Sequence, residues 1–415
     1  MDTDLRSKLR YFIEGKKNET AKLLSGLVSY NSTYGNEGEI QGFLYEHLLS
    51  KGIDARKEYI TDKIRKSPYY TQVSNENTQE KRYNLWGKIG RSSGRSLILN
   101  AHTDIVPSNN GSNSYCRSEI ENDIVKGRGA CDDKGGVAAI ILALESLNHF
   151  GVDLKGSVEY QFVIDEETGG NGTLAMIENG HAADCVIVGE PTELYLCPAC
   201  RGAFWFEIVV KGRSVHMAEI DSGISAIDNA IEVIDILKGF EKVMVEKYGD
   251  HHLFRWHNRP SQVNIGMIRS GQIPSMVPDS AVIEGGVGFL PNCKMHDLMR
   301  EFEDYIRQNV NAWLKDKISI SFNKLKNEAY EEDVDLECVK TMGRCMEGNG
   351  LNGQPRGFIA SCDARLFHHA GNMPCIVFGP GSIKDAHSEH ERCSVADIIK
   401  AAEVLSSFII EWCSQ

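Results

Sequence analysis

Seven acidic or imidazole side chains stand at positions where short apolar runs end or a glycine-rich turn begins a helix. The set is His102, Asp104, Asp132, Glu166, Glu167, Glu190 and His387. Two histidines with several carboxylates form a ligand set that suits Zn²⁺ and other first-row divalent ions. Each residue alone is weak evidence, because a lone histidine is more often structural and a Glu-Glu pair is usually solvated. Their shared location predicts a metal site.

The elements that position these residues alternate between strands and helices. Short apolar runs predict buried strands at 96–101, 158–164, 185–188 and 375–378. Apolar residues at helical spacing predict two helices within 19–51, a buried helix at 137–144 and later helices at 333–346 and 395–412. Such alternation indicates an α/β domain with three layers, α/β/α, whose functional residues gather at the carboxyl ends of the strands.

The order of predicted strands and helices changes after Cys200. Residues 204–210 alternate like an antiparallel strand, 223–240 form an amphipathic helix, 262–289 are strand-like with turns, and 295–313 form a second helix. This order predicts an inserted α+β domain of the β-α-β-β-α-β, ferredoxin-like kind. We therefore expect residues 1–199 and 323–415 to form one α/β domain, interrupted by a second domain at 200–322.

The composition of the chain indicates which partners and which cellular compartment to expect. The 58 acidic and 45 basic side chains give a formal net charge of −13, which repels phosphate backbones and anionic membranes. We expect neither nucleic acid nor a membrane as a partner. A polar N-terminus, the lack of a long apolar run and scattered cysteines predict a cytoplasmic protein with reduced thiols. Cys197 and Cys200 have C-x-x-C spacing without a second pair, which favours a structural role.

Five short motifs occur in order along nearly the whole chain. They are AHTDIVP at 101–107, GRGACDDKGG at 127–136, DEETGG at 165–170, GEPT at 189–192 and AHSEHE at 386–391. Together they resemble the signatures of the M20 metallopeptidase and deacylase family. That family includes acetylornithine deacetylase, succinyl-diaminopimelate desuccinylase, aminoacylase-1 and the glutamate carboxypeptidases.

The resemblance implies a centre of two divalent metal ions, zinc first, with cobalt or manganese as alternatives. Asp132 would bridge the two ions, His102 and Glu190 would complete one site, and Glu167 and His387 would complete the other. The peptide between Asp132 and the residue after it is expected to be cis, as in many relatives.

The resemblance also assigns catalytic roles. Asp104 would orient His102, and Glu166 would be the general base that activates the metal-bridging water and returns the proton to the leaving amine. In the motif GRSVHMA at 212–218, His216 would stabilise the oxyanion, from its own subunit or from a partner's. The inserted domain is thus expected to act as a lid and to form a homodimer.

Substrate contacts are expected at four positions. Asn264 and Arg365 match substrate-binding positions of relatives, and the backbone N–H groups of Gly379 and Gly381 could add donors for a carboxylate. The segment 285–291 departs from the family because it lacks the arginine that many deacylases carry there. A second carboxylate-binding arginine is therefore expected to be absent, which disfavours substrates with two terminal carboxylates.

The predicted function is a di-zinc amidohydrolase that removes a small acyl group from an N-acyl amino acid or related amine, most like acetylornithine deacetylase. Glu190 favours this assignment, because aminopeptidases of the family tend to have Asp there. A metallo-exopeptidase acting on small peptides remains an alternative, as does a non-catalytic binding protein on the same scaffold.

Overall fold

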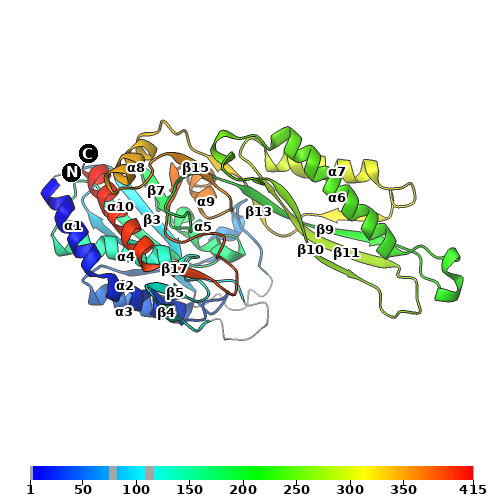
Figure 1. The fold of residues 1–415 in the computed structure, drawn as a ribbon, viewed down its shortest axis with the longest axis horizontal. Helices are drawn as coiled ribbons and strands as arrows, with labels where there is room; N and C mark the ends of the chain where they lie inside the picture. The colour runs from blue at the N-terminus through cyan, green and yellow to red at the C-terminus, as the bar shows by residue number, and fades with distance from the viewer. Residues whose placement is uncertain (1–2, 74–81, 108–115, 415) are drawn as a thin grey trace. The chain divides into compact units, whose positions relative to one another are not determined.

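The chain forms two compact units in the computed structural model, which describes residues 3–73, 82–107 and 116–414. The first unit comprises Met1–Ala199 and Glu331–Gln415, and the second comprises Cys200–Tyr330 (Figure 1). The second boundary lies later than the predicted 322, because β13 (Lys326–Asn327) still pairs with β9 (Gly202–Lys211) of the second unit.

A mixed sheet of nine strands forms the centre of the first unit. Its order is β1-β2-β6-β3-β7-β16-β8-β14, and β15 pairs with β8. The strands are β1 (Arg56–Tyr59), β2 (Tyr83–Gly90), β3 (Ser96–His102), β6 (Ser157–Val163), β7 (Cys185–Val188), β8 (Leu196–Cys200), β14 (Tyr330–Glu331), β15 (Pro355–Phe358) and β16 (Cys375–Val377). The central strands β6, β3, β7 and β16 run parallel, so their carboxyl ends meet at one edge.

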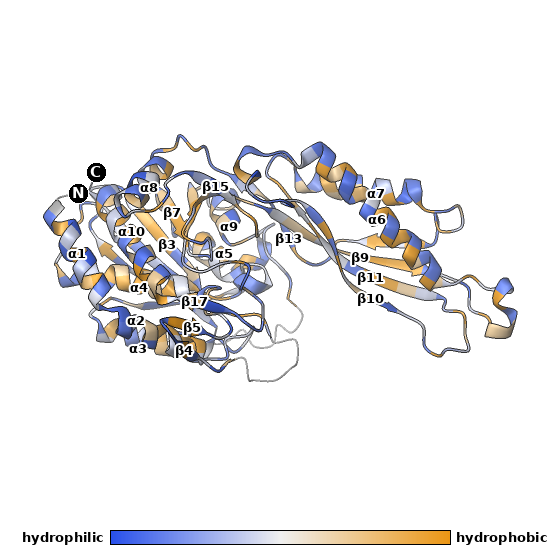
Figure 2. Ribbon diagram, in the orientation of Figure 1, coloured by the Kyte–Doolittle hydropathy of each residue, from blue (hydrophilic) through white to orange (hydrophobic). Residues whose placement is uncertain are grey.

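Helices cover both faces of this sheet, which confirms the predicted three-layer α/β/α fold. One apolar core joins the sheet to α1 (Thr3–Gly15), α2 (Lys17–Val28), α3 (Gly38–Ser50), α4 (Lys134–His149), α8 (Glu337–Gly348) and α10 (Val395–Cys413). A smaller cluster joins α5 (Asn171–Glu178) and α9 (Ala364–His369) to the short helix Asp62–Lys66. Figure 2 shows apolar residues gathered along β3 and β7.

A three-stranded sheet of β17 (Arg392–Ser394), β5 (Ile124–Lys126) and β4 (Glu119–Glu121) completes the first unit. Cys197 and Cys200 are both buried on β8. Among the described residues, none of the helices combines the length and the apolar character needed to cross a membrane.

The second unit is an antiparallel sheet with two helices. Its order is β10 (Gln262–Ser270), β11 (Ser280–Phe289), β9 and β12 (Ile318–Ser321), with α6 (Ala226–Tyr248) and α7 (Met295–Asn309) between the strands in sequence. This is the predicted ferredoxin-like order of elements. The alternate residues of β9 that point toward the helices are Phe204, Phe206, Ile208 and Val210, all buried in one core. Neither α6 nor α7 packs on the other face of this sheet.

Candidate active site

The predicted metal-binding side chains follow the parallel strands of the first unit. His102 is the last residue of β3, Glu167 lies in a short helical turn after β6, Glu190 follows β7, and His387 lies in the loop after β16. Asp132 comes from the glycine-rich turn that precedes α4. Because the carboxyl ends of these strands share one edge, residues far apart in sequence converge there.

Asp132 joins two groups of three side chains. In one group the ligand atoms of His102, Asp132 and Glu190 all lie within 4.8 Å of one another, and in the other those of Asp132, Glu167 and His387 do. His102 Nε2 lies 3.0 Å from Asp132 Oδ1, and His387 Nε2 lies 3.3 Å from Oδ2. His387 Nε2 also lies 3.0 Å from Glu167 Oε1. The two carboxylate oxygens of Asp132 thus face different histidines, as a bridging ligand requires.

The chemistry of these groups fits a pair of divalent cations. Oε1 of Glu190 is buried and has no hydrogen-bond partner among the described residues, and burial raises the pKa of this carboxyl well above its usual value. A buried carboxylate oxygen without a partner is costly unless a cation compensates it. Each group supplies imidazole and carboxylate donors, which zinc accepts.

Hydrogen bonds between the histidines and carboxylates shift their protonation in the metal-free arrangement. Burial alone would raise the pKa of Asp132 and lower that of His387. The contacts of Asp132 with His102 and His387 outweigh burial and hold the pKa of Asp132 well below its usual value. The contacts of His387 with Asp132 and Glu167 raise its pKa to about 11. A cation entering this group must therefore displace a proton from His387.

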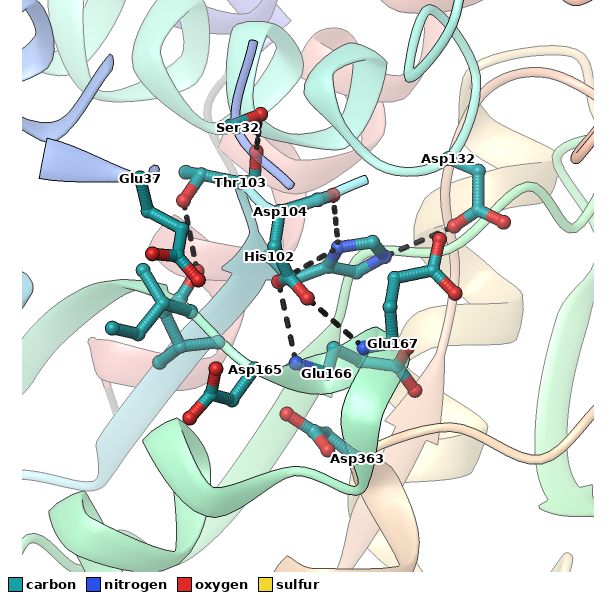
Figure 3. A network of polar contacts seen from close by, with 12 residues as sticks. Ser32, Glu37, His102, Thr103, Asp104, Asp132, Asp165, Glu166, Glu167 and Asp363 are labelled. Atoms are coloured by element: carbon teal, nitrogen blue, oxygen red, sulfur yellow. Dashed lines mark hydrogen bonds and ion pairs between the residues drawn. The ribbon is translucent and has the colours of Figure 1, made fainter. Parts of the chain in front are cut away.

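Asp104 fixes the backbone that carries Glu166 and Glu167 (Figure 3). Its Oδ1 accepts the N–H of Glu166 at 3.2 Å, and its Oδ2 accepts the N–H of Glu167 at 3.0 Å. Nδ1 of His102 lies 3.1 Å from the carbonyl oxygen of Asp104 and 3.4 Å from Oδ1. Asp104 therefore orients both a histidine and the turn with the two glutamates. The peptide between Asp132 and Asp133 is cis, as expected.

Glu166 belongs to neither three-residue group. Its backbone is held beside Glu167, which belongs to one of them, yet its own side chain is in neither group. Burial, followed by the nearby carboxylates of Asp363 and Glu167, raises the pKa of Glu166 well above its usual value. A carboxyl group with a raised pKa is suited to accept and return a proton near neutral pH.

The residues expected to contact the substrate or the oxyanion differ in exposure and in their hydrogen-bond partners. His216 is exposed in the second unit, where its Nδ1 accepts the N–H of Ala218 at 3.2 Å. Asn264 lies on β10 and lines a pocket in the same unit. Arg365 is buried at the start of α9, and its Nη2 donates to the carbonyl of Gly169 at 2.9 Å, just after the turn with Glu166.

The structure corrects the expectation for Gly379, which lies in the loop after β16. The N–H of Gly379 donates to Oγ1 of Thr192 at 3.1 Å, so it is not the free donor for a substrate that the sequence suggested. Gly381 has a φ of 85°, and a Cβ there would lie 2.5 Å from Cβ of Cys131. Glycine at this position therefore lets the loop pack closely against the turn that carries Asp132.

Glu391 was not singled out from the sequence, although it ends the last motif. Its Oε1 accepts the backbone N–H groups of Cys131 and Asp132, both at 3.3 Å, and its Oε2 pairs with Arg128 at 3.1 Å. Glu391 therefore holds the turn that presents Asp132, the residue shared by both three-residue groups. Its position four residues after His387 in the motif was the only signal available from the sequence.

Comparisons with known proteins agree with this architecture. The N-formyl-4-amino-5-aminomethyl-2-methylpyrimidine deformylase of Bacillus subtilis is 24% identical, with 100% of this chain and 99% of the relative covered. A probable carboxypeptidase of Talaromyces marneffei is 27% identical, covering 92% and 83%. The structure of the di-peptidase Dug1p from Saccharomyces cerevisiae superposes with a TM-score of 0.76 at 13% identity, covering 99% of each chain.

The family model described as peptidase family M20/M25/M40 matches residues 98–411, which include every residue of both three-residue groups. The match spans well over half of the chain, and the enzymes of this family are metal-dependent hydrolases of amide bonds. The chain is therefore a member of peptidase family M20/M25/M40.

Proposed function

We propose that this hydrolase removes a small acyl group from an N-acyl amino acid or related amine, in the manner of acetylornithine deacetylase. The observation that carries the proposal is the pair of three-residue groups sharing Asp132, with the proton-accepting Glu166 beside them and in neither. The relatives named as deformylases support it, because their name describes removal of an acyl group from an amine.

The residues of the two groups would hold two divalent ions, which we propose to be zinc. One site is made by His102, Asp132 and Glu190, and the other by Asp132, Glu167 and His387. When bound, such a pair polarises the amide carbonyl and lowers the pKa of water.

The side chains of the chain itself perform the proton transfer and the positioning. We propose that the Glu166 carboxylate takes a proton from the attacking water and then delivers it to the nitrogen of the leaving amine. Asp104 keeps Glu166 in place through the backbone N–H. Arg365 is assigned to a carboxylate of the substrate, and its Nη2 also donates to the carbonyl of Gly169. His216 is assigned to the oxyanion, and Asn264 and the backbone at Gly381 to the substrate.

A second candidate is a metallo-exopeptidase acting on small peptides. It uses the same ligands and the same base, and the relatives named as carboxypeptidases favour it. The two candidates differ in the group on the acyl side of the cleaved amide, which is a short acyl group in one and an amino acid in the other.

A substrate panel separates the two candidates. The purified chain, reconstituted with Zn²⁺ or Co²⁺, is incubated with N-formyl, N-acetyl and N-succinyl amino acids and with dipeptides that carry the same leaving amino acid. We expect kcat/KM to be at least about tenfold higher for a short N-acyl compound than for the matched dipeptide, a difference of about 1.4 kcal/mol. The reverse order would make the chain an exopeptidase, and turnover of none would contradict both candidates.

We also propose a homodimer formed through the second unit. Among the described strands β10 pairs only with β11, so its other edge is open, and it carries the exposed side chains Met267 and Ile268. Ile231 on α6 is exposed as well. We expect light scattering to give the mass of a dimer for the wild type and of a monomer for Ile231→Asp with Ile268→Asp. Leu49→Asp, at an exposed site in the first unit, is the control and should stay dimeric.

A further inference from the structure

A hollow of about 310 Å³ lies in the first unit between three helices, α2, α3 and α4. None of the residues that line it belongs to either three-residue group of the candidate active site. Each helix contributes residues three or four positions apart, which lie on one helical face. Examples are Phe43 and His47 on α3, and Ala138, Ile141 and Glu145 on α4. The hollow is large enough for a small molecule.

Charged side chains of alternating sign close one end of the hollow. Nζ of Lys16 lies 2.8 Å from Oε2 of Glu19, and Nζ of Lys51 lies 3.7 Å from the same oxygen. Nζ of Lys51 also lies 3.2 Å from Oε1 of Glu145. Lys22 lines the hollow as well, but it is exposed, so water and salt screen its charge. Because two ammonium and two carboxylate groups balance, this end favours a small group that carries both charges over a simple anion or cation.

His47 lies at the same end and has a ring nitrogen without a hydrogen-bond partner. Its Nε2 is buried, makes no hydrogen bond to the described residues, and lies 3.9 Å from Oε1 of Glu145, too far for one. The ring stacks on that of Phe43, with centroids 5.8 Å apart. Burial, followed by the charge of Lys51, lowers the pKa of His47, so the imidazole is uncharged at neutral pH. A buried nitrogen of this kind is unfavourable unless a ligand atom pairs with it.

The directions of the three helices place apolar residues at the other end of the hollow. The ring of Tyr30, just after α2, lies 5.4 Å from that of Phe43, and its carbonyl accepts Nζ of Lys134, the first residue of α4, at 3.2 Å. The end of α2 therefore lies beside the earlier parts of α3 and α4, and α2 runs antiparallel to both. Leu23 and Ala138, which also line the hollow, thus lie with Phe43 away from the charged end.

The apolar end suits a short hydrocarbon chain. Leu23 and Phe43 are half-buried there, and Ala138, Ile141 and Leu142 of α4 are buried. An apolar group that covers Leu23 and Phe43 removes their remaining exposed surface from water, which is favourable. A ligand that fits would combine an ammonium group and a carboxylate at one end with a short apolar chain at the other. Free α-amino acids with apolar side chains have this chemistry.

We propose that this hollow binds a free α-amino acid with a small apolar side chain. The ammonium group of the ligand lies between Glu145 and Nε2 of His47. Its carboxylate accepts hydrogen bonds from Lys16 and Lys51, and its side chain lies against Leu23. Hydrogen bonds between charged groups are the strong ones, so both ends of the zwitterion contribute to affinity. The hollow shares no residue with the two three-residue groups, so the site stands whichever amide the enzyme cleaves.

Three ligands that differ by one charged group test the site by isothermal titration calorimetry of the metal-loaded protein at neutral pH. L-leucine carries both charges, 4-methylpentanoate lacks the ammonium group, and 3-methylbutylamine lacks the carboxylate. We expect Kd for L-leucine to be at least about tenfold lower than Kd for either of the other two. An equal Kd for L-leucine and 4-methylpentanoate would indicate a simple anion site and overturn the proposal. The absence of L-leucine binding at about 10 mM would overturn it as well.

Two variants locate the binding in the hollow. Glu145→Gln should raise Kd for L-leucine at least about tenfold and change Kd for 4-methylpentanoate less than about twofold, because only L-leucine carries the ammonium group. Leu23→Trp fills the apolar end and should raise Kd for both ligands at least about tenfold.

Glu411→Gln is the matched control for Glu145→Gln. Glu411 is also a half-buried glutamate paired with a cation, Arg344, but it lies on α10 outside the hollow. Its Kd for L-leucine should equal that of the wild type. A Kd for L-leucine that is unchanged in both Glu145→Gln and Leu23→Trp would mean that the amino acid binds elsewhere, the candidate active site included, and would overturn the proposal.

Discussion

Replacing Glu166 with glutamine is expected to lower kcat about 10³-fold while both metal ions stay bound. The amide keeps the size of the carboxylate but cannot accept the proton. The loop should keep its position, because Asp104 holds the backbone N–H groups of Glu166 and Glu167 rather than their side chains. The measurement is kcat on the best substrate of the panel, together with metal content by elemental analysis.

The neighbouring residue gives the matched control. Glu167 belongs to a three-residue group with Asp132 and His387, and Glu166 does not. Glu167→Gln should therefore lose one equivalent of metal, and its activity should recover partly when excess metal is added. Glu166→Gln should show the opposite pattern, with full metal content and no recovery. A Glu166→Gln enzyme that retains more than a tenth of wild-type kcat would mean that another group accepts the proton.

The part of the site that the sequence predicts consists of residues next to strand ends. The apolar run 185–188 predicts a strand, β7 occupies those residues, and Glu190 follows its end after a single glycine. His102 is itself the last residue of β3. Since parallel strands end at one edge, local patterns are enough to predict that these side chains meet. The five motifs then identify which of them act together.

The parts that the sequence did not predict depend on contacts between distant segments. Arg201 and Gly288 share a space only because β9 and β11 pair antiparallel, with Ala203 opposite Gly288. No periodicity within either strand encodes that register.

The start of helix α6 differs from the prediction for a local reason. The helix begins at Ala226 rather than at residue 223, because Oγ of Ser225 accepts the N–H of Asp228 and caps the helix.

A buried ion triad next to the turn with Glu166 was also not apparent in the sequence. Arg82 donates from Nε and Nη2 to Glu37, at 3.2 and 2.5 Å, and from Nη1 and Nη2 to Asp165, the Nη1 bond being 3.1 Å. All three side chains are buried, and the guanidinium also lies over the ring of Tyr34. Asp165 directly precedes Glu166, so the triad connects the turn with Glu166 to the segment before α3.

Arg82→Met is expected to lower the free energy of unfolding of the first unit by about 3–5 kcal/mol at pH 8. The substitution leaves the carboxylates of Glu37 and Asp165 buried without a cation. Urea unfolding followed by circular dichroism measures the loss. Arg91→Ala is the matched control, because Arg91 pairs with Asp153 where both side chains are about two-thirds exposed, and it should change stability by less than about 1 kcal/mol.

The loss should shrink at lower pH, and the sign follows from the protonation of the triad. Burial raises the pKa of Asp165 to about 7 even though Arg82 acts to lower it, and burial also raises the pKa of Glu37. Without Arg82 both pKa values rise further, so the folded variant binds more protons than the unfolded chain. A raised carboxyl pKa favours the folded state at low pH and loses that effect as pH increases through the folded value. The free energy of unfolding of Arg82→Met should therefore be closer to that of the wild type at pH 5 than at pH 8.

Adding Glu37→Gln and Asp165→Asn to Arg82→Met should restore part of the stability at pH 8 and remove this pH dependence. An equal loss at both pH values would show that Arg82 stabilises the fold by packing and not by compensating buried charge.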